Sequence, residues 1–206
     1  MESLQQTWTS KAELVGTFEN GSTDWLQARM QGIGGSDVGT IAGVNKYSTP
    51  TDLWAYKTGR APGATVTGPM EWGNRLEPVV LDKFQDEHPE LQVLRDVGSW
   101  RNIEQPWQLA NPDAIAVSPL NDYLIEVKTA RYPWKDGIPA SYVMQVQWYM
   151  HVLGLQQALV VVLFGGNEYK EYLLEANSFT QRVLVEQSKA FLRYVYDDLP
   201  PDMWEA

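Results

Sequence analysis

The stretch between Ala110 and Lys128 constrains the fold of this chain more than any other part of the sequence. Two short apolar runs flank a turn at 118–122 that is rich in Pro, Asn and Asp, which predicts a β-hairpin. Side chains alternate along a strand, so Glu126 and Lys128 point to one face of the second run. The opposite face is apolar and consists of Tyr123, Ile125 and Val127. The predicted strand therefore carries a carboxylate and an ammonium side by side on one face.

Asp113 begins the first strand, and an in-register hairpin places it beside Glu126. Two carboxylates held together repel, and one of them takes up a proton unless a cation relieves the repulsion. Hard divalent cations such as Mg²⁺ prefer oxygen ligands of this kind. Lys128 would steady developing negative charge or help to position and activate a water molecule. Together the three side chains predict a hydrolytic centre for phosphodiesters.

A Glu-x-Lys triplet carries little information by itself, because one occurs by chance about once in a chain of this length. A second triplet is present at Glu168–Lys170, and no Asp between Asp136 and Glu168 accompanies it. The Pro112-Asp113 pair ahead of the hairpin distinguishes the first triplet from the second. The alternative interpretation is an ordinary edge hairpin with a surface Glu–Lys pair, which contributes little to stability.

The composition excludes several classes of site. Because the 206 residues include no cysteine, disulfides, zinc–thiolate sites and cysteine-ligated iron–sulfur clusters are excluded, and two histidines are too few for a histidine-built metal site. The net charge of −10 argues against a protein that coats nucleic acid non-specifically. The longest apolar run, 158–164, is too short for a membrane span, and the N-terminus lacks a signal-peptide pattern. We expect one cytoplasmic nuclease domain over residues 1–206 with no membrane partner, in which residues 1–20 form a loosely held arm.

Hydrophobic period and capping residues predict the remaining elements. Helices are expected over 24–30 with Asp24 as cap, 36–42 with Ser36 as cap, 49–59, 69–88, 140–153 and 178–197. The third helix has the clearest start, a capping box of Thr49 and Asp52 with Pro50 in its first turn. Strands 92–97, 99–103 and 107–111 are expected to form an antiparallel meander that continues into the hairpin, with further strands at 158–164 and 169–174. The buried stripe of helix 69–88 is expected to consist of Met70, Trp72, Leu76, Val79, Val80 and Phe84.

Three of these segments carry polar residues with more than one interpretation. The glycine-rich turn 32–37 leads into a helix, an arrangement that binds anions, and Arg29 lies one loop earlier. A tight turn with Ser36 as a simple cap is the alternative. Glu77 lies on the apolar flank of its helix, and it is either turned toward a metal or water or is a boundary glutamate. Gln145 is a polar residue within a helix face shared with Tyr142 and Tyr149.

Five short motifs then follow one another in a recognisable order. They are Arg29-x6-Ser36, Trp72-Gly73-x3-Glu77, Pro112-Asp113, Glu126-x-Lys128 and Tyr142-x2-Gln145-Val146-Gln147. In this order and spacing they resemble the phage lambda exonuclease family of viral-type recombination nucleases, within the PD-(D/E)xK nuclease superfamily. The resemblance spans residues 24–165, and it departs at Ala114, where similar enzymes often have glycine.

The resemblance implies an α/β (α+β) fold with a central mixed β-sheet flanked by helices, the PD-(D/E)xK restriction-endonuclease-like core. It implies a Mg²⁺-dependent 5′→3′ exonuclease that degrades one strand of linear double-stranded DNA and leaves 3′ single-stranded overhangs for recombination by strand annealing. Two metal ions are expected, with Mn²⁺ able to substitute. The implied partners are double-stranded DNA ends, a single-strand annealing protein and further copies of the chain in a homotrimeric ring, in a bacterial host or encoded by a prophage.

The resemblance also implies roles for residues of the cutting centre. Asp113 and Glu126 match metal ligands, with the backbone carbonyl of Val127 as a third, and Lys128 matches the catalytic lysine. Two helper positions match residues that hold the metal shell or the nucleophilic water, and they are Glu77 and Gln145.

Other matched positions concern the DNA end. Arg29 and Ser36 match the pocket for the 5′-terminal phosphate, and Met70 matches a wedge between terminal base pairs. A charge-assisted contact to each new terminal phosphate contributes about 1.5–3 kcal/mol, which is enough to draw the next scissile bond toward the metals.

Two other functions are compatible with the same core. A sequence-specific or structure-specific endonuclease would cut closed circular DNA as well as linear DNA. A non-cutting module that binds DNA ends would have lost the acidic residues or the lysine, and this chain retains them.

Overall fold

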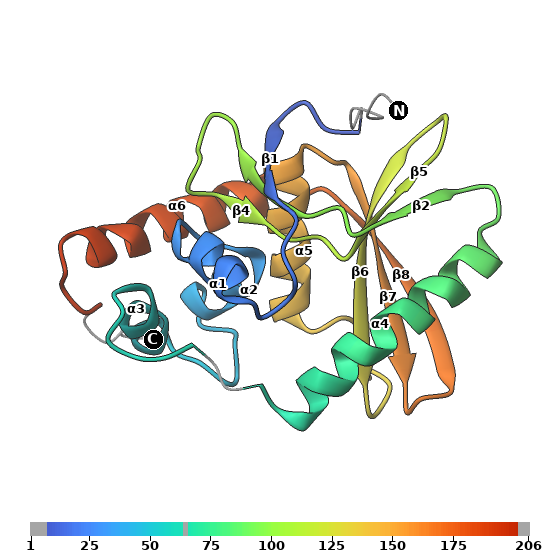
Figure 1. The fold of residues 1–206 in the computed structure, drawn as a ribbon, viewed down its shortest axis with the longest axis horizontal. Helices are drawn as coiled ribbons and strands as arrows, with labels where there is room; N and C mark the ends of the chain where they lie inside the picture. Colours follow the sequence, from blue (N-terminus) through green and yellow to red (C-terminus); the bar gives the residue numbers. More distant parts are fainter. Residues whose placement is uncertain (1–7, 64–65, 202–206) are drawn as a thin grey trace.

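A mixed β-sheet forms the centre of the fold in this computed structural model, which describes residues 8–63 and 66–201. Within the described residues the sheet has five strands in the order β2-β5-β6-β7-β8 (Figure 1). The strands are β2 (Gln92–Arg95), β5 (Ala114–Val117), β6 (Asp122–Ala130), β7 (Gln157–Phe164) and β8 (Glu168–Glu175). β6 and β7 run parallel, whereas the other neighbours are antiparallel. The predicted mixed sheet is confirmed.

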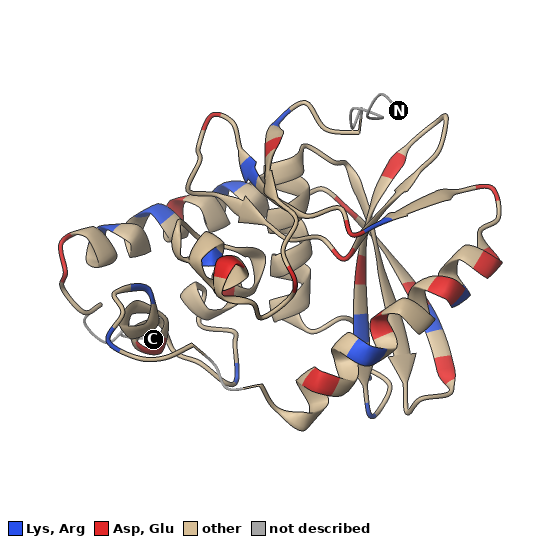
Figure 2. Ribbon diagram, in the orientation of Figure 1, with Lys and Arg blue, Asp and Glu red and all other residues tan. Residues whose placement is uncertain are grey.

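The predicted hairpin is the β5–β6 pair. Ser118 closes its turn, because the Ser118 hydroxyl accepts the Asn121 N–H at 3.0 Å and donates to the Asn121 carbonyl at 2.8 Å. Ala114 pairs with Ile125, so extending the register by one residue places Asp113 beside Glu126. The second half of β6 carries an acidic position followed by a basic one (Figure 2).

Helices cover both faces of the sheet. α4 (Gly68–Glu87) lies on one face, and α5 (Ala140–Leu153) lies on the other, between β6 and β7 in the chain (Figure 1). α4 packs on the face of β6 that carries Ile125 and Val127, as the strand alternation predicts. α5 ends at Gly154, whose φ of 77° is left-handed, and α6 (Ser178–Tyr196) packs against α5. Among the described helices, none has the length and apolar character needed to cross a membrane.

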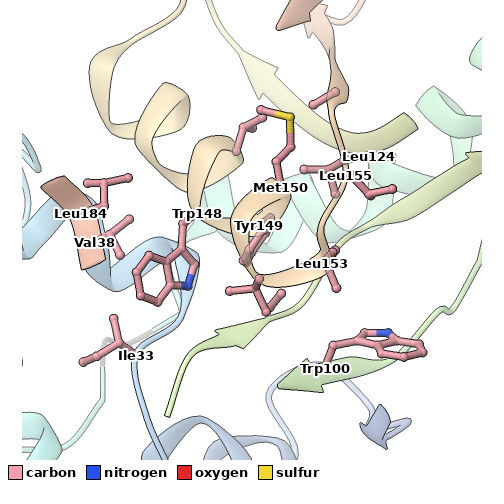
Figure 3. Close-up of a cluster of buried hydrophobic side chains, with 14 of the residues drawn as sticks. Ile33, Val38, Trp100, Leu124, Trp148, Tyr149, Met150, Leu153, Leu155 and Leu184 are labelled. Atoms are coloured by element: carbon pink, nitrogen blue, oxygen red, sulfur yellow. The ribbon is translucent and has the colours of Figure 1, made fainter. Parts of the chain in front are cut away.

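Three short helices precede α4. They are α1 (Thr23–Met30), α2 (Gly35–Ile41) and α3 (Pro50–Lys57). α2 packs closely on α5 around a buried cluster that includes Ile33, Val38, Trp148, Tyr149 and Leu184 (Figure 3). A methyl group at Gly35 would lie 2.4 Å from the Tyr149 ring, so this approach of α2 to α5 requires glycine.

A second, smaller sheet corrects the expected meander. β3 (Ser99–Asn102) pairs with β1 (Ala12–Gly16) and β4 (Leu109–Ala110), and not with β2, so the single meander is wrong. The chain leaves the central sheet between β2 and β3 because Asp96 and Gly98 have left-handed φ values of 53° and 82°.

The expected loose arm is wrong from residue 8 onward. Trp8 is buried and its ring packs edge-on against Trp100 at 4.8 Å between centroids, and β1 adds a strand to β3. These apolar contacts and ladder hydrogen bonds fix a segment that has no clear hydrophobic period. Residues 1–7 of the expected arm lie outside the described residues.

Two helix starts also differ from expectation. α1 begins one residue earlier, with the Ser22 hydroxyl accepting the Trp25 N–H at 3.2 Å, so Asp24 lies inside the helix. α2 begins at Gly35, so Ser36 lies in its first turn and does not cap it. The Asp37 carboxylate accepts the Gly34 N–H at 2.9 Å instead, and this amide of the glycine-rich turn is therefore already paired. α3 has the predicted capping box.

The expected apolar stripe of α4 is only half correct. Val80 and Phe84 are buried against the sheet, but Met70, Trp72 and Val79 are 48%, 62% and 55% exposed. The first turns of α4 lie beside residues 129–131 and 165–166 instead of over the apolar core. Together these segments line an open groove of about 330 Å³.

Candidate active site

The sheet brings four of the predicted site residues together at one place, which we call the acidic centre: Glu77, Asp113, Glu126 and Lys128. Asp113 is half-buried at the start of β5, and its Oδ2 accepts the backbone N–H of Val127 at 2.7 Å. Glu126 is 1% exposed in the middle of β6. The contact between Asp113 and the Val127 amide fixes the aspartate beside the glutamate. The sequence places these groups together because the hairpin pairs in register.

The two oxygens of Glu126 have different surroundings. Oε1 accepts hydrogen bonds from Lys128 Nζ at 2.5 Å and from Gln145 Nε2 at 2.7 Å. Oε2 is buried and has no hydrogen-bond partner among the described residues. A buried carboxylate oxygen without a partner is costly, and its presence marks a place where a further electron-pair acceptor is expected.

Carboxyl pKa values in the acidic centre are all raised. Burial raises the pKa of Glu126 to about 8, with a further increase from the negative charge of Asp113 that Lys128 only partly offsets. Burial and the Asp113 charge raise the pKa of Glu77 to about 7. Burial also raises the pKa of Asp113, although Lys128 opposes the shift. The site therefore holds more negative charge than its own lysine neutralises.

Lys128 is held in the charged form by these carboxylates. Burial alone would lower the pKa of its ammonium, but Glu126 and Asp113 outweigh burial, and the pKa is raised. The Nζ atom also lies 4.9 Å from the centre of the Tyr142 ring, an attractive position for a cation. Its side chain retains 17% exposure, so the charge is available at the mouth of the site.

The acidic centre fits a hard divalent cation. It offers oxygen donors from Asp113 and Glu126, and one of these oxygens is buried with no partner from residues 8–63 or 66–201. The raised carboxyl pKa values fall when positive charge arrives. Across 8–63 and 66–201, no group of three or more His, Asp or Glu side chains is gathered closely enough to hold a metal. A cation here would therefore be held by two side-chain carboxylates together with other oxygens.

Asp96 is an additional acidic residue that the sequence analysis did not select. Its negative charge contributes to the raised pKa of Glu77. Asp96 directly follows Arg95, the last residue of β2, which pairs with Ala114. An aspartate directly after a strand was the available signal. Its approach to Glu77 was not predictable, because it depends on the order of the strands in the sheet.

Arg29 and Ser36 meet in a second polar cluster. Arg29 Nη2 donates to the Ser36 hydroxyl at 2.7 Å and approaches Asp37 Oδ1 at 3.4 Å, and the guanidinium stacks over the Trp25 ring at 4.6 Å. Lys57 Nζ completes the cluster at 2.9 Å from Asp37 Oδ2. We call Arg29, Ser36, Asp37 and Lys57 the Arg29 cluster.

The Arg29 cluster contains two residues that the sequence analysis missed. Lys57 is buried beside Leu53 and Trp54, and a lysine on the apolar face of a short helix was the available signal. Asp37 follows Ser36 directly in the sequence. Their pairing joins segments 20 positions apart, so neither residue suggests the other before the chain is folded.

Tyr149 of α5 lies between the two clusters. Burial raises the pKa of its hydroxyl, the Glu126 charge raises it further, and the Arg29 charge opposes the shift. The same hydroxyl lies 3.5 Å from Gln145 Nε2. Charges from the acidic centre and from Arg29 therefore both act on the hydroxyl of this one buried residue.

Met70 lies apart from both clusters. It occupies the first turn of α4, half-exposed, where the predicted wedge would need to reach DNA. The groove along this part of α4 is lined by Trp72 and, from the segment after Lys128, by Arg131.

Comparison with known proteins identifies the family of this chain. The sequence profile of the YqaJ-like viral recombinase domain matches residues 24–156. An uncharacterized protein, YqaJ of Bacillus subtilis (strain 168), is 36% identical over 170 residues, which are 78% of this chain and 52% of that protein. The chain therefore spans about half the length of this curated relative.

Solved structures share the fold. An alkaline exonuclease from Laribacter hongkongensis, LHK-Exo, superimposes with a TM-score of 0.72 at 20% identity, covering 86% of this chain and 94% of that one. LHK-Exo in complex with dAMP superimposes with a TM-score of 0.71 at 21% identity, with the same coverage. These neighbours share the arrangement of the central sheet and its flanking helices with this chain. With the profile match over most of its length, the chain belongs to the YqaJ-like viral recombinase domain family, and its resemblance to the phage lambda exonucleases is confirmed.

Proposed function

We propose that this protein is a Mg²⁺-dependent exonuclease that degrades the 5′-terminated strand of linear double-stranded DNA in the 5′→3′ direction. The product is a 3′ single-stranded overhang for recombination by strand annealing. One observation carries the proposal: Glu126 and Asp113 are held together against Lys128, and the buried Oε2 of Glu126 has no partner in the part of the chain that the structure describes. Membership of a viral recombinase family and the fold shared with an alkaline exonuclease support it.

In this proposal Asp113, Glu126 and the backbone carbonyl of Val127 hold the metal, with two ions expected and Mn²⁺ able to substitute. When bound, the metal supplies Lewis-acid activation of the scissile phosphate and lowers the pKa of a water molecule. Lys128 donates to a phosphate oxygen and stabilises the negative charge that develops on it. Glu77, whose carboxyl belongs to the acidic centre, accepts the proton of the attacking water. Gln145 keeps Glu126 in place through its 2.7 Å hydrogen bond.

The end of the strand is recognised by Arg29 and Ser36 in this proposal. A terminal phosphate carries close to two negative charges, and the guanidinium binds such groups with charge-assisted hydrogen bonds. Each cleavage leaves a new 5′-phosphate on the shortened strand, which can enter the same pocket and draw the next scissile bond toward the acidic centre. Met70, exposed at the start of α4, is the proposed wedge between terminal base pairs. The dAMP bound to LHK-Exo is a mononucleotide of the kind that such cleavage releases.

The proposal extends to the assembly in which the protein works. We place one nuclease domain over residues 1–206, three copies in a ring around the DNA, a single-strand annealing protein as partner and the bacterial cytoplasm as location. The likeness to the phage lambda exonuclease family supports each of these. Mass photometry at nanomolar concentration tests the ring directly: a mass of three chains is expected, and a monomer at every concentration would contradict it.

The decisive experiment compares DNA substrates of different topology. The protein is incubated with a 5′-phosphorylated linear duplex and with a closed circular duplex, with Mg²⁺, with Mn²⁺ and with EDTA. We expect nucleotide release from the linear duplex alone and only with a metal. The released nucleotides should come from the 5′ ends of the strands and not from the 3′ ends. Cutting of the closed circle would favour the endonuclease on the same core, and tight end binding without release at any metal concentration would favour the non-cutting module.

A further inference from the structure

Lys57 ends α3 and reaches beneath the loop that connects Arg29 at the end of α1 to Ser36 at the start of α2. Its Nζ donates to the Arg29 carbonyl at 2.8 Å and to the Gly32 carbonyl at 2.7 Å, and it lies 2.9 Å from Asp37 Oδ2. An ammonium has three N–H donors, so these three acceptors satisfy it completely. The side chain is 2% exposed, so Lys57 itself cannot meet a ligand.

The two carbonyls that Lys57 binds define the course of the loop. The Arg29 carbonyl lies in the last turn of α1, where carbonyls lack helical partners. On the far side of the loop, the Ile33 N–H donates to the Trp107 carbonyl at 2.8 Å. A methyl group at Gly32 would lie 2.0 Å from that Trp107 oxygen, so the loop passes too close for any side chain. Lys57 and the backbone at Trp107 therefore clamp the loop from two sides.

Lys57 also determines which groups remain available to Arg29. Asp37 is buried, and its Oδ2 is occupied by Lys57 and by the Gly34 N–H. Burial would raise the pKa of Asp37, but Lys57 and then Arg29 outweigh burial, and the pKa lies below its usual value. Arg29 consequently meets Asp37 only at 3.4 Å and directs its stronger 2.7 Å hydrogen bond to Ser36. Two cations and one carboxylate leave one positive charge in excess.

We propose that Lys57 is a positioning residue for recognition of the 5′-terminal phosphate: it holds the backbone beneath Arg29 and occupies Asp37, so that Arg29 and Ser36 stay directed at one dianionic group. This inference rests on the proposed function and concerns the choice of DNA end, not the cleavage of the bond. In Lys57→Met the buried Asp37 carboxylate keeps a single cation. Arg29 then turns from Ser36 and the phosphate toward Asp37.

The test measures end preference, defined as kcat/KM on a 5′-phosphorylated duplex divided by kcat/KM on the same duplex with a 5′-hydroxyl. We expect Lys57→Met to reduce this ratio at least about tenfold, the lower end for a lost charge-assisted hydrogen bond. The loss lies in KM for phosphorylated ends, and kcat/KM on hydroxyl ends stays within about threefold, because no group of the acidic centre is changed. Lys170→Met, at an exposed Glu-x-Lys triplet, is the matched control and keeps the wild-type ratio.

Equilibrium binding to the same two duplexes in EDTA provides a readout that does not depend on cutting. We expect the preference for the phosphorylated end to fall in parallel with the kinetic ratio. Folded Lys57→Met with a ratio within twofold of wild type overturns the inference. Should Lys57→Met not fold, Lys57→Gln is measured instead. It keeps donors for the two carbonyls but lacks the charge that occupies Asp37. An unchanged ratio of the two kcat/KM values in Lys57→Gln also overturns the inference.

The wild-type results separate this inference from the proposed function. Preferential binding of phosphorylated ends without metal-dependent cutting overturns the exonuclease and leaves the role of Lys57 to be decided by the binding ratios. Metal-dependent cutting with an unchanged ratio in Lys57→Met overturns only the role of Lys57. A wild-type protein that does not distinguish the two ends overturns the phosphate pocket and the positioning role together.

Discussion

The acidic centre and the Arg29 cluster both bury a carboxylate next to a lysine, yet the two carboxylates respond in opposite ways. Asp37 meets two cations and a backbone amide, and its pKa is lowered. Glu126 meets one lysine, one glutamine amide and the charge of Asp113, and its pKa is raised to about 8. Both carboxyls are buried, yet burial is accompanied by a stable ion pair at Asp37 and by a carboxyl that favours its protonated form at Glu126. The number of neighbouring positive charges decides between them.

This difference separates a buried ion pair whose atoms are all partnered from a carboxylate that lacks a partner. All three donors of the Lys57 ammonium and both oxygens of Asp37 have partners, so this ion pair needs no further group to be stable. The acidic centre leaves Glu126 Oε2 without a partner among the described residues and gathers carboxyls that repel one another. Groups with pKa values perturbed in this way are typical of functional sites. Three predictions test whether the two clusters differ as described.

The largest expected effect comes from removing the lysine of the acidic centre. Lys128→Met keeps most of the side-chain volume beside Tyr142 but removes the charge that we propose stabilises the phosphate. We expect the cutting rate with Mg²⁺ to fall by about 10²–10³-fold, the loss typical of one such donor. End binding in EDTA is expected to persist.

Lys170→Met is the control for this prediction, because the second triplet is exposed and its pair with Glu168 at 2.7 Å contributes little. Single-turnover kinetics on a labelled duplex measure both variants. A Lys128→Met enzyme within a few-fold of wild type would show that the lysine has no part in the chemistry.

A smaller effect is expected at the Arg29 cluster. Arg29→Ala removes the guanidinium but leaves the acidic centre intact, so about a tenfold or greater loss is expected on 5′-phosphorylated ends, as for one charge-assisted hydrogen bond. Ends with a 5′-hydroxyl should be slowed much less. The ratio of kcat/KM values on the two ends measures this, and equal slowing of both would discard the phosphate pocket.

A third expected effect is on stability as a function of pH without metal. Glu126 and Glu77 have folded pKa values of about 8 and about 7 against 4.5 unfolded, so the folded protein holds protons that the unfolded chain has released. Their contribution to stability is complete below pH 4.5 and is lost as the pH rises toward 8. Asp37 behaves in the opposite way, since its contribution is present above pH 3.8 and is lost only as the pH falls through its lowered value.

Urea unfolding in EDTA between pH 5 and pH 9 measures this dependence. We expect the free energy of unfolding to fall over the range in wild type and to fall less in Glu126→Gln, which cannot ionise. Mg²⁺ is expected to restore stability in wild type most strongly at the alkaline end. If the free energy of unfolding had the same pH dependence in the two proteins, the pKa of Glu126 would not be the raised one.

Local rules predicted the elements whose signals lie within one segment. The β5–β6 hairpin, the α3 capping box and the Ala140–Leu153 helix all follow the sequence closely. The acidic centre was predictable for the same reason, because Asp113, Glu126 and Lys128 belong to a single hairpin. The placement of Gln145 against Glu126 came only from the family resemblance, since it depends on how a crossover helix lies on the sheet.

Features that depend on distant contacts were not predictable. β3 looks like a continuation of β2, but left-handed backbone at Asp96 and Gly98 sends it to a separate sheet with β1. The pairing of Lys57 with Asp37 depends on how α3 folds back beneath the loop before α2. The exposure of Trp72 and Val79 was missed because helical period shows which residues share a face, and it does not show where the sheet beneath them ends.

The contact of Gly35 with the Tyr149 ring ties the two clusters mechanically. The ring has no room to yield to even one added carbon, and its hydroxyl reaches the glutamine that bonds Glu126. A displacement of α2 would therefore push the same ring whose hydroxyl lies beside the acidic centre. Ser36 follows Gly35 in α2, so the residue proposed to bind the strand end and the glutamine that holds Glu126 are both linked to the position of one tyrosine.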